Sequence, residues 1–550
     1  MNQHIRCPTL VDQLTVDTWV TSTDDRAEGM QALVSKWSPL RSFDTFDAFD
    51  AAGTDGFDSA GYFGAVFDGR YVYFSPEQHD SLKTHAIVLR YDTHSAFIDR
   101  TSYSAYDASK SSGLDVRGFY GAAFDGVYVY FIPRQIDMEY YHTRLLRLHT
   151  GMDFKDPAAW DAFDVGLKQS AQGVAFDGRY LYLVPGFTGT PKKENEYCAN
   201  VIRYDTHAPF KDRTSYATAD LKHCLGGTVG CYDGASFDGR FVYFAPLYNG
   251  VVIRYDTHGA FDDSTRWQKF DMTPLGAGSV VGTVFDGRYL YYCAYACDKI
   301  VRFDTAGDFI DPVSWRCCPC DQTKGLKTAG FDGGFFDGRF VYFVPFVFGS
   351  KVEGYTFHSN FLRYDTQGEF NDPGSWDAHD ASRASGLDSV GYNAGAFDGR
   401  YFYCAPWRHG VWDGHNWRTK PAVLGVHSTI LRYDTLGQDG SFSLRYCDYG
   451  HNGGLNGAVL GPSFLVNTEN GVRSVTAHKI LPPGRHRLTG VYDGNRIQLW
   501  IDGKLGVERT AAGRIVNNNL PVTAGHIQDG LGQFRGVIEA IEVLATVKQP

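Results

Sequence analysis

Two aspartates and an asparagine stand at equivalent positions of a motif that recurs along this 550-residue chain. Seven copies of an eight-residue stretch, FDGRYVYF in its first form, begin at 67, 124, 176, 237, 285, 336 and 397. Two carboxylates in one cleft can act as general acid and base, or hold a cation such as Ca²⁺ together with an amide oxygen. The residues four positions before each copy are Phe63, Tyr120, Gln172, Asp233, Val281, Asp332 and Asn393.

Asp233 and Asp332 are therefore the predicted catalytic carboxylates, and with Asn393 they form one candidate metal site. His223, on the segment that enters the fourth copy, is a third catalytic candidate. A hydrated polar plug of a channel is the alternative interpretation of this series, and it involves no catalysis.

Aromatic and imidazole side chains gather in the segments that follow the motif copies. These segments are long in copies 1, 2, 3, 6 and 7 and short in copies 4 (LYNG) and 5 (ACDK), which predicts a wall with one low side. Aromatic faces stack on sugar rings while polar groups fix hydroxyls, so this composition is typical of carbohydrate recognition. Small cores local to the long loops are the alternative. The predicted ligand-binding residues are Trp407, Trp412, Trp417, Tyr140, Tyr141, His409, Asn393 and Gln172.

Eleven cysteines include a group within one repeat, and their odd number leaves at least one outside any intramolecular disulfide. The spacing CAYAC followed by CCPC lacks the paired CxxC of common zinc sites, so a structural cluster is favoured over a metal site. The second candidate metal set is Cys293, Cys297, Cys317 and Cys320.

The elements that position these residues are short strands. Each unit has a small, Gly-rich segment, an Asp-Gly turn, an alternating aromatic segment, a segment ending in RYDT or a variant of it, and an aromatic segment such as AAWDAFD. Seven four-stranded units predict an all-β, seven-bladed β-propeller. The segment at 43–50, FDTFDAFD, precedes the first unit, and the last unit lacks a fourth strand. We expect 43–50 to complete the last blade and close the ring.

A repeated ion pair is predicted inside the units. The second copy has Val127 where the others have Arg, and the same unit has His149 where the others have Asp. The Arg and Asp positions would be neighbours on antiparallel strands. The predicted pairs are Arg70 with Asp92, Arg179 with Asp205, Arg240 with Asp256, Arg288 with Asp304, Arg339 with Asp365, and Arg400 with Asp434.

Segments outside the repeats share a different pattern. They read LTVDTWVTS (14–22), MQALVSKW (30–37), GSFSLRY (440–446), HRLTGVYDGNRIQLWIDGKL (486–505) and FRGVIEAIEVL (534–544). In this order they resemble a laminin G-like, concanavalin A-like jelly roll. The resemblance implies a β-sandwich formed by 1–40 and 438–550, with the propeller at 41–437 inserted between its halves. It also implies binding of glycans or proteins, sometimes through Ca²⁺, although turn chemistry is favoured for Asp493 and Asp502.

Charge and hydropathy exclude some partners. The net charge is -11 and no basic run is present, which argues against nucleic acid or anionic membrane. No apolar stretch is long enough for a transmembrane helix, and the start lacks the pattern of a signal peptide. An extracellular or surface location is favoured by the domain type alone. No HExxH, P-loop or GxSxG motif is present to define a reaction class.

Together these features predict a glycan-binding or adhesion protein whose partner is a carbohydrate, a cell-surface glycan or another protein. A polysaccharide-degrading hydrolase or lyase that uses the two aspartates is the alternative from another class. The third hypothesis is a structural component of a larger extracellular assembly, with the propeller as its docking surface.

Overall fold

Strands and turns make up almost all of the computed structural model, which describes residues 7–22, 30–39, 42–79, 83–191, 196–227, 230–350, 354–410, 425–447, 457–458, 461–477, 479, 481–528 and 532–548. Within these ranges the only α-helix is α1 (Leu221–Leu225). No helix of the described part is long and apolar enough to cross a membrane.

Seven antiparallel sheets repeat one four-stranded pattern. From blade 1 to blade 7 the strands are β4 (Tyr62–Phe67), β5 (Tyr71–Pro76), β6 (Ile87–Asp92) and β7 (Tyr103–Asp107); β8 (Phe119–Phe124), β9 (Tyr128–Pro133), β12 (Arg144–His149) and β13 (Trp160–Asp164); β14 (Gln169–Phe176), β15 (Tyr180–Thr188), β17 (Asn200–Asp205) and β18 (Tyr216–Asp220); β19 (Tyr232–Phe237), β20 (Phe241–Pro246), β21 (Val251–Asp256) and β22 (Trp267–Asp271); β23 (Val280–Phe285), β24 (Tyr289–Ala294), β25 (Lys299–Asp304) and β26 (Trp315–Pro319); β29 (Phe331–Phe336), β30 (Phe340–Pro345), β33 (Asn360–Asp365) and β34 (Trp376–Asp380); and β35 (Tyr392–Phe397), β36 (Tyr401–Pro406), β39 (Thr429–Asp434) and β3 (Phe46–Asp50).

The seven blades form a closed ring, which makes this part of the chain a β-propeller. The first strand of each blade packs beside the first strand of the next, and β35 packs beside β4. The last blade takes its outer strand, β3, from the beginning of the chain, where Phe46 pairs with Tyr433 and Asp50 with Thr429. Blades therefore pack face to face on both sides all round the ring, and the aromatic residues of their strands fill the spaces between them.

The Asp-Gly turn of each motif is held by its own aspartate. In blade 1, Asp68 Oδ1 accepts from the backbone N–H groups of Arg70 and Tyr71 at 2.8 and 2.6 Å, and Oδ2 accepts from the Tyr73 hydroxyl at 3.0 Å. All six predicted Arg–Asp pairs are present, at 2.7–2.9 Å, and in each of them both Nε and Nη2 of the arginine bond the carboxylate. The most visible motif of the sequence is thus scaffold.

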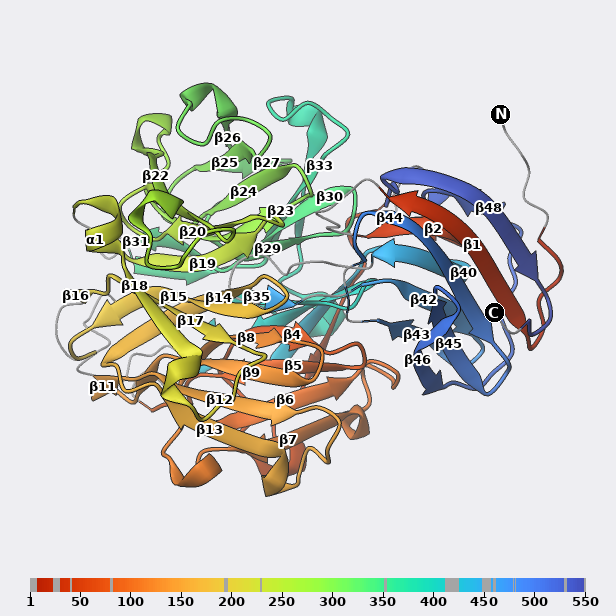
Figure 1. The fold of residues 1–550 in the computed structure, drawn as a ribbon, viewed down its shortest axis with the longest axis horizontal. Coiled ribbons are helices and arrows are strands. Elements are labelled where there is room, and N and C mark those ends of the chain that lie inside the picture. The colour runs from red at the N-terminus through yellow and green to blue at the C-terminus, as the bar shows by residue number, and fades with distance from the viewer. Residues whose placement is uncertain are drawn as a thin grey trace.

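Two further sheets pack together beside the propeller (Figure 1). One has the order β46 (Lys504–Thr510), β45 (Arg496–Ile501), β44 (Gly484–Tyr492), β1 (Leu14–Ser22) and β48 (Gly536–Leu544). The other has the order β43 (Gly471–Thr476), β42 (Ser463–Thr468), β40 (Leu436–Cys447), β2 (Gln31–Pro39) and β47 (Thr523–Ala524). Apolar residues of both sheets share one core, so the two ends of the chain form a β-sandwich.

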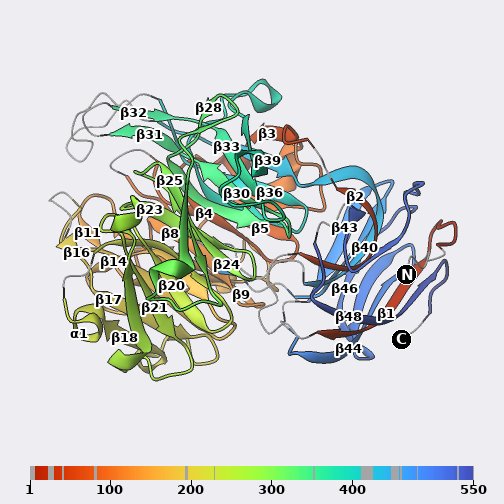
Figure 2. The ribbon, with the colours of Figure 1, turned by 90° about the horizontal axis from the view of Figure 1, so that it is seen from above.

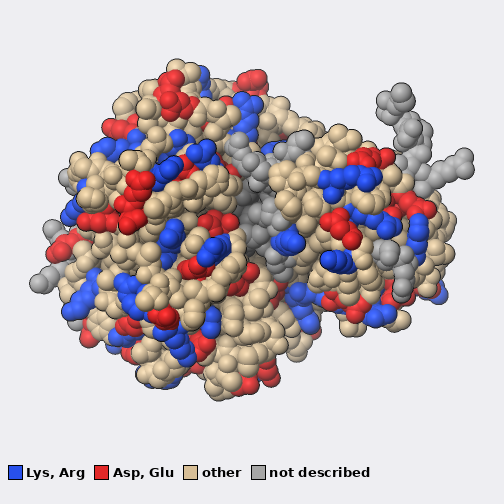
Figure 3. Space-filling view, viewed as in Figure 1, with Lys and Arg blue, Asp and Glu red and all other residues tan. Residues whose placement is uncertain are grey.

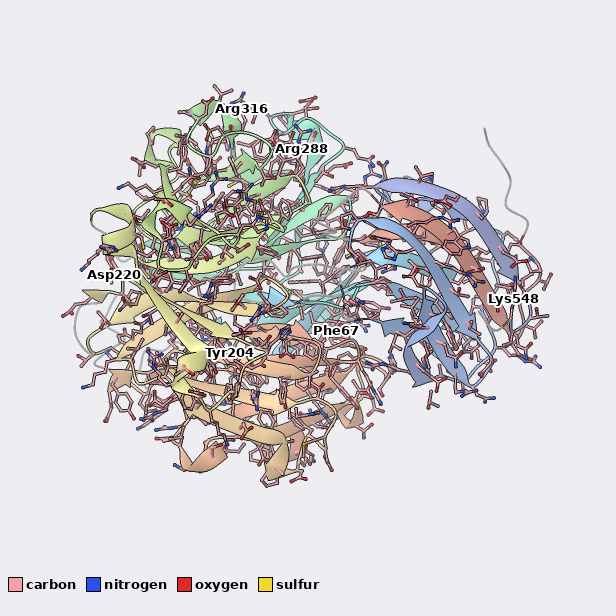
Figure 4. The ribbon with its side chains drawn as sticks, viewed as in Figure 1. Phe67, Tyr204, Asp220, Arg288, Arg316 and Lys548 are labelled. Atoms are coloured by element: carbon pink, nitrogen blue, oxygen red, sulfur yellow. The ribbon has the colours of Figure 1, made fainter. Side chains whose placement is uncertain are left out.

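The sandwich contacts the propeller face that carries the Asp-Gly turns. Arg535 donates to the backbone oxygens of Asp286 and Gly287 at 2.9 and 3.1 Å, and Arg445 donates to that of Gly399 at 2.7 Å. In Figure 4, Arg288 of such a turn lies nearer the sandwich than Asp220, which lies at the opposite side of the propeller. The opposite face, with α1, is therefore left uncovered by the sandwich (Figure 2).

A short segment of the sandwich half of the chain reaches the inside of the ring. The backbone of β41 (Gly457–Ala458) pairs in parallel with Ala123 and Phe124 of β8, the first strand of blade 2. It also lies close to β14 and β4. These two residues therefore lie inside the ring, beside the first strands of blades 1, 2 and 3.

Candidate functional site at the propeller mouth

A bulge in the first strand of every blade positions the residues of the predicted series. In blade 4, Tyr232 pairs with Pro246 and Ala235 with Phe244, so Asp233 and Gly234 lie opposite one residue of β20. The second bulge residue has a positive φ in all seven blades, and it is Gly in six and Ala394 in the seventh. This backbone turns the preceding side chain out of the sheet pattern. We call the uncovered end of the channel the mouth, and its mouth residues are Phe63, Tyr120, Gln172, Asp233, Val281, Asp332 and Asn393.

The polar mouth residues bond one another. Asp233 Oδ2 accepts from the Tyr120 hydroxyl at 2.7 Å and from Gln172 Nε2 at 2.9 Å. Asp332 Oδ2 accepts from Asn393 Nδ2 at 2.5 Å. Both aspartates are 3% exposed, and the other oxygen of each carboxyl, as well as Asn393 Oδ1, has no hydrogen-bond partner within the described part of the chain. The structure therefore brings together four predicted site residues, Gln172, Asp233, Asp332 and Asn393.

Burial changes the chemistry of the two carboxyls. It raises the pKa of Asp233 to about 7, against the opposing effects of the Tyr120 hydrogen bond and the nearby Arg134. Burial also raises the pKa of Asp332 well above its ordinary value, and the negative charge of Asp233 adds to the rise. Because each charge disfavours the other, the pair holds a proton more readily than two isolated aspartates would.

A second set of residues at the mouth was missed by the sequence analysis. It consists of the third residue after the eight-residue motif of each blade, and we call it the second ring: Glu77, Arg134, Gly186, Leu247, Tyr295, Phe346 and Trp407. Only Trp407 was predicted. Aligning the motif copies three residues further, through SPE, IPR, VPG, APL, CAY, VPF and APW, identifies the whole set.

The charged pair of the second ring lies beside the mouth residues. Glu77 is fully buried, and one of its oxygens accepts from Arg134 at 2.5 Å. The Arg134 guanidinium lies 4.6 Å from the centre of the Tyr120 ring. Burial raises the pKa of Glu77, while Arg134 and Arg408 oppose that rise. The opposite charges of Glu77 and Arg134 thus neutralise each other at this side of the mouth.

Five rings from both sets form a continuous aromatic arc. Ring centres are 6.3 Å apart for Tyr295 and Phe346, 5.1 Å for Phe346 and Trp407, 4.6 Å for Trp407 and Phe63, and 3.6 Å for Phe63 and Tyr120. The arc runs from blade 5 through blades 6, 7 and 1 to blade 2. Phe63, Tyr120 and Phe346 are buried in this arc, whereas Trp407 and Tyr295 are partly exposed and form its accessible part.

Two exposed tyrosines lie side by side in the loops of blades 3 and 4. Tyr248, in the short loop of blade 4, is 52% exposed, and Tyr197 of the neighbouring blade is 43% exposed. Their ring centres lie 6.3 Å apart. The pKa of Tyr248 is raised by burial of its hydroxyl and by nearby acidic groups that include Asp233. Tyr248 therefore lies within electrostatic reach of Asp233, and Tyr197 packs beside it.

Other predicted ligand residues lie elsewhere or outside the described part. Tyr141 is 4% exposed and packs on Phe187, so its ring face is covered, whereas Tyr140 is partly exposed on the same hairpin. His409 lies beside His427. His223 is exposed on α1, and the hydrogen bonds of the two aspartates come from other residues. Trp412 and Trp417 lie outside the described residues.

Histidines at the start of the third strands are part of the scaffold. His142 Nε2 bonds the backbone oxygen of Arg117 at 3.0 Å, and its Nδ1 accepts from the backbone N–H of Arg144 at 3.1 Å. His85 and His358 accept a backbone N–H in the same way. Burial lowers the pKa to about 3 for His85, His358 and His427, and to about 4 for His142.

The candidate metal sets gain no support. All eleven cysteines are free thiols, and burial raises the pKa of Cys293, Cys297 and Cys320. Cys317, in the strand β26, is partly buried and packs against a different core from Cys293 and Cys320. Among the described residues, no group of three or more His, Cys, Asp or Glu side chains is placed to hold a metal ion. These cysteines pack as small apolar side chains in the cores on either side of blade 5.

The chain matches no protein-family model and no curated protein sequence. Its fold is similar to that of a catalytically inactive virginiamycin B lyase from Staphylococcus aureus with quinupristin, at 12% identity and a TM-score of 0.42, over 70% of this chain and 98% of the other. It is also similar to the periplasmic gluconolactonase PpgL of Pseudomonas aeruginosa (14% identity, TM-score 0.37, 66% and 96% covered) and to YjhT (12%, 0.37, 65% and 97%). At these values the likeness carries no information on activity.

Proposed function

We propose that this protein binds carbohydrate at the propeller mouth. The observation that carries the proposal is the aromatic arc, which borders a group of hydrogen-bonding side chains that keep unused oxygens. A sugar ring offers an apolar face to aromatic rings and hydroxyl donors to such oxygens, so both halves of this arrangement suit it. The site lies at the centre of the uncovered face rather than along the long loops, and Tyr248 and Tyr197 extend it toward solvent.

The sandwich serves in this proposal as a second binding or docking module. We assign it to residues 1–40 and 438–550, as a laminin G-like, concanavalin A-like domain, with the propeller at 41–437. Its support is the strand order of the flanking segments and their shared core. A protein or cell-surface glycan would then engage the sandwich while the propeller mouth remains open.

Cleavage of a polysaccharide is the second candidate function. One observation favours it: the pKa of Asp233 is raised to about 7, and Asp332 is a second carboxyl with a raised pKa in the same mouth. A protonated carboxyl at neutral pH can donate to a glycosidic oxygen, and its ionised neighbour can act as the base or nucleophile. Asp233 and Asp332 would share these two roles.

A glycan-array screen tests the binding proposal. The wild type is compared with Trp407→Ala, which removes the centre of the aromatic arc, and with Trp500→Ala, a half-buried tryptophan of the sandwich strand β45. We expect Trp407→Ala to weaken binding of any glycan at least tenfold and Trp500→Ala to leave it unchanged. Loss only in Trp500→Ala would move the site to the sandwich, and no binding by the wild type would favour the assembly role.

Each bound glycan is then incubated with the protein and its length measured. Intact glycan supports recognition without catalysis. Shortened chains that persist with the wild type and disappear with Asp233→Asn or Asp332→Asn would show the hydrolase or lyase alternative instead.

A further inference from the structure

Among the mouth residues, the buried side-chain atoms without a hydrogen-bond partner in the described part of the chain are all acceptors, whereas the second ring has one such acceptor, Glu77 Oε2, and two such donors, Arg134 Nε and Trp407 Nε1. Asp233 Oδ1, Asp332 Oδ1 and Asn393 Oδ1 are buried and have no partner among the described residues. The amide of Asn393 already donates to Asp332, so its oxygen is the atom left over. Buried acceptors without donors are costly, and a ligand that fills the mouth must therefore supply donors.

The mouth favours a cation when its two aspartates are ionised, and a bound cation would in turn favour their ionised forms. Three carboxyl groups, Glu77, Asp233 and Asp332, face two guanidinium groups, Arg134 and Arg408. Arg134 is engaged with Glu77, and Arg408 donates to Gln78 and lies over the Trp407 ring. With both aspartates ionised the mouth is net negative, and the two aspartates have only neutral hydrogen-bond donors.

The surrounding rings suit an organic cation better than a metal ion. Tyr120 of the aromatic arc donates a hydrogen bond to Asp233. Tyr295 lies close enough for the charges of both aspartates to raise its pKa. Aromatic faces attract ammonium groups, whereas Ca²⁺ requires six to eight oxygen ligands, about twice what these side chains offer. An ammonium group at the end of a ligand is also small enough to reach the buried carboxyls of Asp233 and Asp332.

We propose that the mouth binds a primary ammonium group, whose three N–H donors match Asp233 Oδ1, Asp332 Oδ1 and Asn393 Oδ1. This inference rests on the proposed carbohydrate function and names its ligand class: glycans that contain free, unacetylated amino sugars. The sugar ring lies against the aromatic arc, and the amino group enters between the two carboxyls.

Calorimetric titration with oligosaccharides of one length and linkage tests the inference. The probes are β-1,4-linked tetramers of glucosamine, N-acetylglucosamine and glucose, with butylamine as an amine that carries no sugar. The proteins are the wild type, Asp233→Asn, Asp332→Asn and, as a matched control, Asp262→Asn, which removes one exposed charge from an outer loop of blade 4. Circular dichroism and the unfolding midpoint establish that each variant is folded.

We expect the glucosamine tetramer to bind the wild type at least tenfold more tightly than either neutral tetramer. Asp233→Asn and Asp332→Asn should abolish that preference, and Asp262→Asn should keep it. A preference that survives in both mouth variants would come from the overall negative charge and would overturn the inference.

The remaining outcomes separate this inference from the proposed function. Equal binding of the three tetramers, lost in Trp407→Ala, overturns the ammonium site and leaves carbohydrate binding in place. Binding of butylamine that the mouth variants abolish, without binding of any tetramer, supports the ammonium site and contradicts carbohydrate binding. Absence of binding by every probe contradicts both.

Discussion

Asp233 is a buried carboxyl whose direct hydrogen-bond donors, Tyr120 and Gln172, are both neutral. Such a group is expensive to ionise, which is the reason for its raised pKa. A protein that retains this arrangement forgoes stability at neutral pH. That cost is characteristic of sites whose electrostatics are completed by a ligand or used in a reaction.

We predict that Asp233→Asn stabilises the protein at alkaline pH. The pKa of Asp233 is about 7 when folded and ordinarily 3.8, so the protonated group costs nothing below about pH 3.8, and the penalty grows until about pH 7. The asparagine keeps a hydrogen-bonding oxygen for Tyr120 and carries no charge. We expect about 2–4 kcal/mol of additional unfolding free energy at pH 8 and little difference near pH 4.

Denaturant unfolding at both pH values measures this effect. Asp262→Asn, on an exposed loop, should change the unfolding free energy by less than about 0.5 kcal/mol at either pH. An Asp233→Asn variant no more stable than wild type at pH 8 would show that the carboxyl is adequately solvated.

At the scale of the strands, the bulge of blade 7 differs from the other six. Its second residue, Ala394, has a φ of 43°, where the equivalent residues are glycines. A side chain is strained in this left-handed region, whereas glycine is not. We predict that Ala394→Gly stabilises the protein by about 0.5–1 kcal/mol after the greater freedom of glycine in the unfolded chain is subtracted.

The unfolding midpoint in guanidinium chloride, at constant m-value, measures the effect of Ala394→Gly and of a matched control variant. The matched change in the other direction is Gly333→Ala, where φ is 76° and the new Cβ would lie 3.1 Å from that of Ala394. This variant should lose more than 1 kcal/mol. A destabilised Ala394→Gly variant would mean that packing of the Ala394 methyl group stabilises the protein by more than the strain of its backbone destabilises it.

The buried histidines of the third strands predict acid sensitivity. His85, His142, His358 and His427 are neutral when folded, with pKa values of about 3 to 4, and take up protons near pH 6.5 when unfolded. Their contribution to stability is therefore complete above about pH 6.5 and is lost as the pH falls toward 4. Each contributes up to about 1.4 kcal/mol per pH unit.

His358→Asn tests this linkage because blade 4 already has an asparagine, Asn249, in a corresponding role, with its Oδ1 accepting the Val251 N–H at 3.2 Å. The unfolding free energy should fall less steeply between pH 7.5, 6.5 and 5.5 in the variant, because the variant takes up about one proton fewer on unfolding. An unchanged slope would mean that His358 titrates normally in the folded protein.

The sequence predicts the strands and the mouth residues well because both follow the repeat. Asp233, Asp332 and Asn393 stand out against equivalent residues once the motif copies are aligned, and the Arg–Asp pairs follow from the coincidence of Val127 with His149. Glu77 and Arg134 were within reach of the same alignment. The role of His142 was not, because its partner is a backbone oxygen of the loop that enters β8, and that approach depends on how the strands are packed.

At the scale of the whole molecule, the N-terminal segment supplies strands to both the propeller and the sandwich. The first fifty residues supply β1 and β2 to the two sheets of the sandwich and β3 to the last blade. We predict that a chain beginning at residue 51 fails to fold, because it leaves blade 7 without its outer strand and removes from each sandwich sheet the strand that joins the edge strand, β48 or β47, to the rest. Circular dichroism and a thermal melt check this, and a cooperative transition near that of the wild type would contradict it.

The arrangement of the two units also directs ligands to one side. The sandwich contacts the Asp-Gly turns through Arg535 and Arg445, and β41 pairs with β8 inside the ring. Positive and negative side chains are intermixed on the face in Figure 3, where no broad basic patch is visible. The packing of the two units could not be predicted from the sequence, because Arg535 bonds backbone oxygens that any turn residue provides.

The most direct measurement of the central claim, that the mouth is a ligand site, is a crystal structure of the protein soaked with the glycan that binds most tightly. We predict density for a sugar ring against Trp407 and Phe346, with one of its donors within hydrogen-bond distance of Asp233 or Asp332. Density confined to the sandwich or the outer loops, with the mouth holding only water, would contradict the account.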